Sequence, residues 1–140
     1  MKNGKNYRLA YVVLKLRRAR GVPQRVLADD AGVDGTRLSA IENCRVIGPG
    51  NDLVIRIASA LKLGDAERAE LLQAAAHDRV MREMARNLPP ERLRLLARCM
   101  DASRVLSQPD CEVLEDLVER LIGPREQLLP LPQGKEVTDT

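Results

Sequence analysis

Residues 23–43 read PQRVLADDAGVDGTRLSAIEN, and this stretch decides the fold. Pro23 suits the first turn of a short helix, and Gly32 ends that helix because glycine accepts the positive φ of a tight turn. Asp34 is a good N-cap for a further helix, which we predict over residues 35–43. The positions expected to face inward are apolar and recur at helical spacing: Val26, Leu27, Ala31, Leu38 and Ile41.

The two helices and the turn between them meet the requirements of a helix-turn-helix. Ala28 is small where the helices cross, and Val33 is an apolar residue that can fill the turn after Gly32. The second helix keeps Leu38 and Ile41 inward and short polar residues outward. In this motif the second helix lies in the major groove of DNA, with its first residues nearest the base edges. A helical hairpin that does not bind DNA is the alternative interpretation.

The segments on either side also have the pattern of helices. Gly and Pro residues separate the predicted helices, which span residues 7–20, 52–63, 65–87, 90–106 and 110–122. We expect Gly21 to end the first of these, Asn51 or Asp52 to cap the second, and Asp65 to cap the third. The third is either one long helix or two helices with a bend near His77.

Two Pro-containing pairs are predicted to interrupt the second half of the chain. Gln108-Pro109 separates the last two helices, and Gly123-Pro124 ends the last one before a tail. The apolar positions expected on the later helices are Leu71, Leu72, Ala75, Val80, Met81, Met84, Leu93, Leu96, Ala97, Met100, Val105, Val113, Leu114, Leu117, Val118, Leu121 and Ile122.

Composition limits the class of protein. The 140 residues include no Phe, no Trp and only 2 Tyr, so the core must be aliphatic, which favours helices. No apolar run approaches the roughly 20 residues that span a bilayer. The basic start lacks the cleavage site of a signal peptide. Three Cys residues without paired spacing argue against a disulfide framework and favour the cytoplasm.

The net charge of +3 hides a division along the chain. Residues 1–63 carry 12 Lys and Arg against 5 Asp and Glu, a net charge of +7. Residues 64–140 carry 11 basic and 15 acidic residues, a net charge of −4. This division indicates a module that binds a polyanion, joined to a segment that does not contact it.

The segment LRRARGVPQRVLADDAGVDGTRLSAIEN at residues 16–43, followed by IRIASALKL at 55–63, resembles the Cro/CI-type (XRE family) helix-turn-helix DNA-binding domain. The resemblance covers residues 9–63. It implies an all-α fold, with a five-helix lambda-repressor-like DNA-binding domain followed by a helical C-terminal dimerisation region. The sequence departs from the family pattern at Cys44, where the family usually has Gly, and the loop before Asn51 is slightly long.

The resemblance also implies roles for individual residues. Gln24 should meet a phosphate and can also brace the second helix of the motif, and Asn43 and Arg45 match phosphate-contacting positions. Arg17 and Glu42 match a family ion pair that ties the first helix to the third, so we assign them to structure. The full expected DNA-binding set is Gln24, Arg25, Asp34, Gly35, Thr36, Arg37, Ser39, Ala40, Asn43 and Arg45.

Direct reading of bases is expected to be sparse. Gly35 and Ala40 match base-reading positions but lack side chains that read bases. Thr36 can offer a methyl group to thymine, and Arg37 can reach the acceptors of guanine. Shape readout, or the basic arm at residues 1–5 in a minor groove, would then carry more of the specificity.

Few residues outside this unit indicate chemistry. His77 is the only histidine and lacks the cluster that a metal site needs, so we expect no metal, no cofactor and no enzyme activity. Cys99 and Cys111 are expected to be small buried apolar residues, whereas the basic loop around Cys44 could lower the pKa of that thiol. A solvated helix face is expected to carry Arg79, Arg82, Glu83 and Arg86.

We expect three segments, a DNA-binding domain at 1–64, a helical oligomerisation or partner region at 65–123, and a flexible tail at 124–140. The two apolar helices of the second half cannot hide both of their faces alone, which favours a homodimer formed mainly by residues 88–122. The expected dimer contacts are Leu93, Leu96, Met100, Val113, Leu114, Leu117, Val118 and Leu121.

The function favoured by the sequence is a sequence-specific regulator of transcription that binds double-stranded DNA. Its simplest form is a bacterial or phage repressor that acts as a homodimer on a palindromic operator. The alternative is an antitoxin-like autoregulator whose C-terminal helices bind a partner protein. A ligand-gated sensor is a third class, but no convergent polar groups mark a pocket for it.

Overall fold

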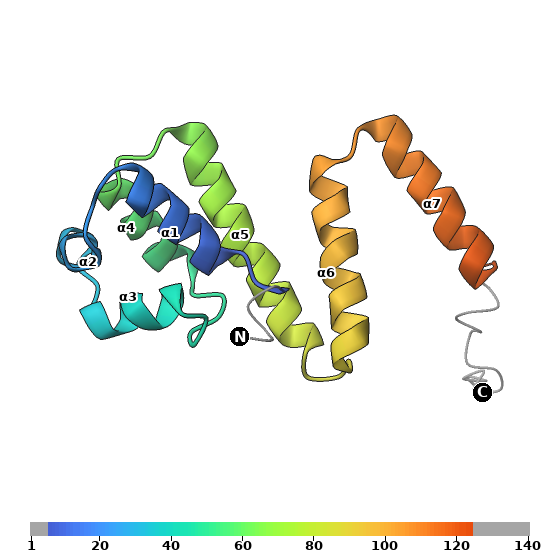
Figure 1. Ribbon diagram of the computed structural model, residues 1–140, viewed down its shortest axis with the longest axis horizontal. Coiled ribbons are helices and arrows are strands. Elements are labelled where there is room, and N and C mark those ends of the chain that lie inside the picture. The colour runs from blue at the N-terminus through green and yellow to red at the C-terminus, as the bar shows by residue number, and fades with distance from the viewer. Residues whose placement is uncertain (1–5, 125–140) are drawn as a thin grey trace, which may run out of the picture. The chain divides into compact units, whose positions relative to one another are not determined.

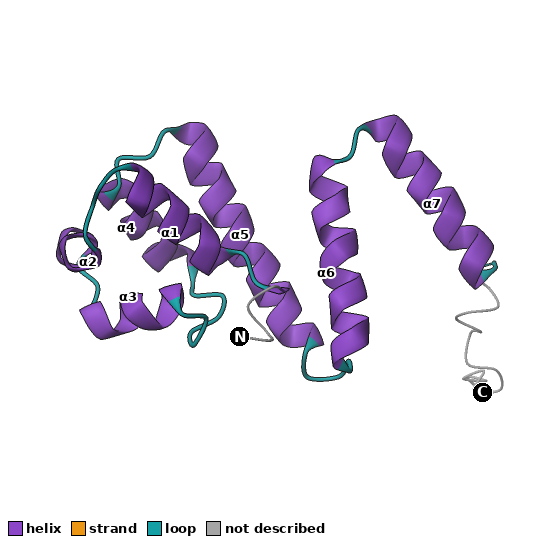
Figure 2. Cartoon of the chain, in the orientation of Figure 1, coloured by secondary structure: helices purple, strands orange, loops and turns teal. Residues whose placement is uncertain are grey.

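The computed structural model describes residues 6–124. These residues form helices and no strand, so the predicted all-α fold is confirmed (Figures 1 and 2). The arm at residues 1–5 and the tail at 125–140 lie outside the described residues. The helices are α1 (Leu9–Ala19), α2 (Gln24–Ala31), α3 (Gly35–Glu42), α4 (Asn51–Ala60), α5 (Asp65–Met84), α6 (Pro90–Val105) and α7 (Gln108–Ile122).

Four of these helices end in the same way, with a residue in the left-handed conformation. In α1 and α2 that residue is glycine, Gly21 at φ 62° and Gly32 at φ 65°. In α3 and α4 it is Cys44 at φ 58° and Lys62 at φ 55°. In each case the next backbone N–H bonds to a carbonyl of the last helical turn, as in a Schellman motif. The α4 helix therefore ends at Ala60, before the predicted end at residue 63.

The first five helices enclose an aliphatic core (Figure 1). The α5 helix packs against both α1 and α4, and it is a single helix of 20 residues without a bend near His77. The chain forms two compact units, which meet between Arg98 and Cys99. The boundary expected after residue 64 does not separate them, because α5 belongs to the same core as α1–α4. The buried core residues on α1–α5 include Leu9, Val12, Val13, Leu16, Leu27, Leu38, Ile41, Leu53, Val54, Ile57, Leu61 and Leu71.

Ion pairs on the surface also join α5 to α1. Arg20 Nη2 lies 2.6 Å from Glu67 Oε1, and Lys15 Nζ lies 3.0 Å from Glu70 Oε1. The hydrogen bond from Arg20 lowers the pKa of Glu67. Both pairs are open to solvent, so they add little to stability compared with the core between the same helices.

Several predicted inward positions are exposed. On α2 and α5 these positions lie beside buried residues of the same helix. Val26 is 44% exposed beside the buried Leu27, and Val80 and Met84 are exposed on α5. On α6, Val105 is 79% exposed. No residue of α7 is buried within the chain.

Three predicted helix starts differ from the structure. The α4 helix begins at Asn51 with Gly50 as its N-cap, and α5 begins at Asp65 with Gly64 as its N-cap, so the expected side-chain caps are absent from both. The pair Gln108-Pro109 does not break the chain but opens α7. This is possible because Pro is tolerated in a first helical turn, where Ser107 Oγ accepts a hydrogen bond from a backbone N–H.

Candidate nucleic-acid interface

The α3 helix has one buried face and one exposed face. Leu38 and Ile41 are buried against the core, while Thr36 and Arg37 at the start of the helix are exposed. Asp34 Oδ1 accepts the backbone N–H of Thr36 at 2.9 Å, which caps the first turn. The first turn of α3 is therefore held in place and open to a ligand.

The expected DNA-binding residues gather on α3, the start of α2 and the loop after α3. Gln24, Ser39 and Ala40 are half-buried. The Asn43 amide donates to Ser39 O at 2.8 Å, so it is already bonded to its own helix. The residues of the set that are exposed are Arg25, Asp34, Gly35, Thr36, Arg37, Asn43 and Arg45.

Arg17, Glu42 and Gln24 lock three helices together. Arg17 Nε lies 2.7 Å from Glu42 Oε1, and Arg17 Nη2 lies 3.3 Å from Glu42 Oε2. The remaining guanidinium nitrogen donates to Val22 O at 3.0 Å, and Gln24 Nε2 donates to Glu42 Oε2. The Glu42 side chain is only 3% exposed, so its charge is compensated by these donors and not by water. Gln24 therefore braces α3 in this structure.

The turn between α2 and α3 has a brace of its own. Arg56 on α4 donates from Nη1 to Gly32 O at 3.0 Å. Gly32 adopts a φ of 65°, and Val33 directly after it is buried in the turn. The helix-turn-helix is thus supported from α1 through Arg17 and from α4 through Arg56.

The loop from α3 to α4 is held by α5. Arg79 Nη1 donates to Pro49 O at 2.9 Å, and its Nη2 donates to the Asn51 side chain at 3.1 Å. Arg82 Nη1 donates to Ile47 O at 2.7 Å. Of the face predicted to be solvated, Arg82, Glu83 and Arg86 are exposed, whereas Arg79 is half-buried. The prediction missed that Arg79 and Arg82 supply donors to carbonyls of the loop.

The start of α1 is also bound to α5, through two residues that sequence reasoning did not assign. Asp78 accepts hydrogen bonds from the backbone N–H groups of Arg8 and Leu9, and His77 Nε2 bonds to Asn6 O at 2.9 Å. Both side chains are buried. Burial raises the pKa of Asp78, with the two backbone hydrogen bonds acting against it. A signal was present, because Asp78 falls in the inward register of α5, where a carboxylate must find donors.

The cysteines are placed differently from expectation. Burial, and secondarily the charge of Asp78, raise the pKa of the Cys44 thiol, so the prediction of a lowered pKa is wrong. Cys99 is exposed and Cys111 half-buried, so neither is a core residue. Among the described residues, no group of three or more His, Cys, Asp and Glu can hold a metal ion. In the same residues, none of the helices has the length and hydropathy to span a membrane.

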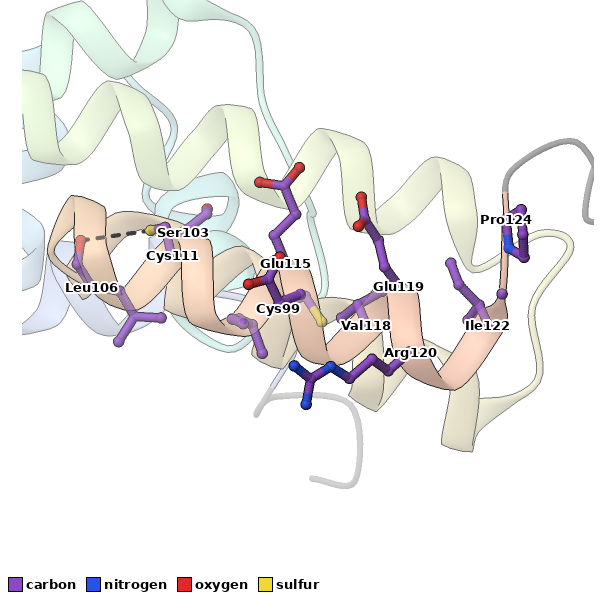
Figure 3. Close-up of a pocket in the computed structure, with 13 residues that line it drawn as sticks. Cys99, Ser103, Leu106, Cys111, Glu115, Val118, Glu119, Arg120, Ile122 and Pro124 are labelled. Atoms are coloured by element: carbon purple, nitrogen blue, oxygen red, sulfur yellow. Dashed lines mark hydrogen bonds between the residues drawn. The ribbon is translucent and has the colours of Figure 1, made fainter.

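The end of α6 and the α7 helix line an open groove of about 920 Å³ (Figure 3). Its apolar lining includes Leu106, Val118 and Ile122, with Cys99 and Cys111 on the same lining. Glu115 and Glu119 lie one turn apart on α7 and also line the groove. Beyond this groove, Val113, Leu117 and Leu121 form an apolar stripe on α7 that is more than half exposed.

Residues 12–71 match the model of a protein family described as a helix-turn-helix domain. The match covers α2 and α3 with the helices that support them, and it includes the start of α5. The searches of curated proteins and of solved structures gave no match. This part of the chain is therefore similar to a helix-turn-helix domain, in agreement with the motif predicted at residues 23–43.

Proposed function

We propose that this chain is a sequence-specific regulator of transcription that inserts α3 into the major groove of double-stranded DNA. The observation that carries the proposal is the exposed, capped first turn of α3, which is braced from α1, α2 and α4 inside a helix-turn-helix domain. A recognition element must be rigid, because base contacts require side chains placed within a hydrogen-bond length of the base edges.

Thr36 and Arg37 are the side chains proposed to read bases. Both are exposed on the first turn of α3, next to Gly35, which has no side chain to obstruct close approach. Arg25 at the start of α2 and Arg45 in the loop after α3 are both exposed and are proposed to contact phosphates, which position the protein without reading sequence. Asn43 is proposed to contact a phosphate only if its amide leaves Ser39 O.

The regulator is proposed to act as a homodimeric repressor on a palindromic operator. One helix-turn-helix contacts few base pairs, and two half-sites about one helical turn apart supply useful affinity. The partly exposed dimer residues proposed on α7 are Val113, Leu117 and Leu121. Leu93, Leu96, Met100 and Leu114 are half-buried within the chain, so they are proposed to contribute less area.

Selection of bound DNA from a random pool tests the function. We expect a palindromic consensus whose binding weakens with salt by roughly 0.9 log units per log unit for each phosphate neutralised. Arg37→Ala should relax the preference at one position of each half-site, with a cost of about 1–3 kcal/mol for the base that Arg37 reads. No enrichment of any sequence over the starting pool would contradict the proposal.

Light scattering of Leu117→Glu tests the dimer. A charge in the apolar stripe should convert a dimer into a monomer at micromolar concentration, while Glu112→Gln on the same helix should leave the dimer intact. If wild type is itself monomeric, the antitoxin-like alternative is favoured, in which the same stripe binds a different protein. Activation of transcription would be distinguished from repression by a reporter downstream of the selected site.

A further inference from the structure

The loop at residues 44–50 leaves α3 directly after the positions proposed to contact DNA. Cys44 and Arg45 turn the chain back onto α3, with the Arg45 N–H bonded to Ala40 O at 2.8 Å. The loop then passes against α5, where Gly48 and Pro49 are buried. The exposed Arg45 side chain is therefore carried on a short segment that is fixed at both ends.

The contact between this loop and α5 leaves no room for adjustment at Gly48. A Cβ atom added there would lie 2.6 Å from Arg79 Cγ and 3.0 Å from Arg79 N. Gly48 also has a φ of 59°, which other residues rarely adopt. The backbone of the loop thus sits directly on α5 at Arg79.

Arg79 and Arg82 provide the hydrogen bonds that hold this arrangement. The forked guanidinium of Arg79 reaches two acceptors at the end of the loop, Pro49 O and Asn51 Oδ1. Arg82 reaches a third acceptor, Ile47 O, at 2.7 Å. A lysine at position 79 would keep the charge but could not satisfy these two separated acceptors with a planar fork.

We propose that Arg79 and Arg82 are positioning residues for DNA binding, which hold the α3–α4 loop so that Arg45 meets a phosphate. The proposal rests on the proposed function, because it concerns how tightly and through which phosphates the chain binds DNA. Neither arginine is proposed to contact DNA itself. Their guanidinium groups are turned to the loop carbonyls, and their effect on DNA is transmitted through the loop.

The test compares charge-conserving variants of the full chain. Binding of Arg79→Lys and Arg82→Lys is measured by fluorescence anisotropy, on a mixed-sequence duplex and on the selected consensus, over a series of salt concentrations. We expect Arg79→Lys to weaken binding about tenfold, in line with hydrogen bonds to a charged group. We also expect its salt slope to fall by about 0.9, although no charge has been removed, because one phosphate contact is lost.

A double-mutant cycle with Arg45→Ala identifies the route of the effect. If Arg79 acts through Arg45, the double variant Arg79→Lys/Arg45→Ala should bind DNA as tightly as the single variant that has the lower affinity. Gly48→Ala should weaken binding in the same way, since its Cβ displaces Arg79. Arg86→Lys is the matched control, because it also keeps the charge, and Arg86 is exposed and pairs with Glu83, not with the loop.

The possible outcomes separate the two proposals. The positioning role would be overturned if both lysine variants had the affinity and salt slope of the wild type. It would also be overturned if the effects of Arg79→Lys and Arg45→Ala were fully additive. In either case the proposal that the chain binds DNA would stand. Failure of the wild type to bind either duplex would overturn both. Far-UV circular dichroism checks that each variant is folded. If Arg79→Lys is unfolded, Arg82→Ala at the exposed position 82 tests the same route, because it removes the donor to Ile47 O. Its loss of affinity should then disappear in the Arg45→Ala background.

Discussion

The Asp78 side chain caps α1 from a different helix, with its Oδ2 accepting the backbone N–H of Leu9 at 3.0 Å although 69 residues separate the two positions. The first backbone N–H groups of a helix have no partner within the helix. No side chain at the start of α1 caps them, so this buried carboxylate on α5 takes that role. The start of α1 therefore depends on α5 for a satisfied backbone.

Asp78→Ala should destabilise the folded chain. The change leaves buried N–H groups of Arg8 and Leu9 without an acceptor, which costs about 1–3 kcal/mol. Urea denaturation followed by circular dichroism at 222 nm measures the loss. Asp30→Ala, at an exposed position on α2, is the control and should change stability by less than about 0.5 kcal/mol. Equal effects of the two changes would contradict the capping role.

Asp78 should also give stability a specific dependence on pH. Burial raises the pKa of this carboxyl above 3.8, so between the unfolded and folded pKa values the folded chain binds more protons than the unfolded chain. The stabilisation that comes from protonated Asp78 is therefore fully present below the pKa that this carboxyl has in the unfolded chain. It is lost as the pH rises through the pKa of the same carboxyl in the folded chain. The stability difference between wild type and Asp78→Asn should narrow as pH rises from about 4. A difference that widens would show that the hydrogen bonds outweigh burial.

Glu42→Ala should be among the most damaging single changes in the domain. It leaves the Arg17 guanidinium, which is 14% exposed, without its charge partner and removes an acceptor of Gln24. Breaking a buried pair in this way costs about 3–5 kcal/mol. The control is Glu70→Ala, which breaks the open pair with Lys15 and should cost less than about 1 kcal/mol. Thermal unfolding of both variants measures the two losses of stability. Equal losses would contradict the view that burial makes the Arg17–Glu42 pair the stronger one.

Cys44→Gly should stabilise the chain. Cys44 has a φ of 58°, a conformation that costs most residues about 1–2 kcal/mol and glycine almost nothing. Cys99→Gly, in the middle of α6, should instead destabilise the chain by about 0.3 kcal/mol, the difference in helix propensity between the two residues. Chemical denaturation should therefore give opposite signs for the same substitution at two positions. A loss of stability for Cys44→Gly would mean that packing of the thiol outweighs the backbone strain.

Much of the fold could be predicted because its signals are local. The period of Leu27, Ala31, Leu38 and Ile41 set which faces of α2 and α3 are buried, and Asp34 capped α3 through its nearest neighbours. Helix starts were less predictable. Gly50 and Gly64 hold the N-cap positions where side-chain caps were expected, because backbone conformation and not side-chain chemistry decided those sites.

The residues of the candidate site were also predictable only in part. The exposed residues on the first turn of α3 follow from helical period alone, since inward Leu38 and Ile41 leave Thr36 and Arg37 outside. Arg79 and Arg82 could not be recognised from their own segment. Their row has the pattern of a solvated face, and only the loop lying against α5 gives them acceptors.

The sequence by itself determined the helices, the glycine turn between α2 and α3, and the aliphatic core, because capping, turn conformation and periodicity act over a few residues. The tertiary structure decided which distant groups satisfy one another: Asp78 with the start of α1, Arg79 and Arg82 with the α3–α4 loop. It also decided which apolar positions remain open, as on α7. A buried polar group must be paired wherever the chain brings a partner, and that partner is set by packing between helices and not by its position in the sequence.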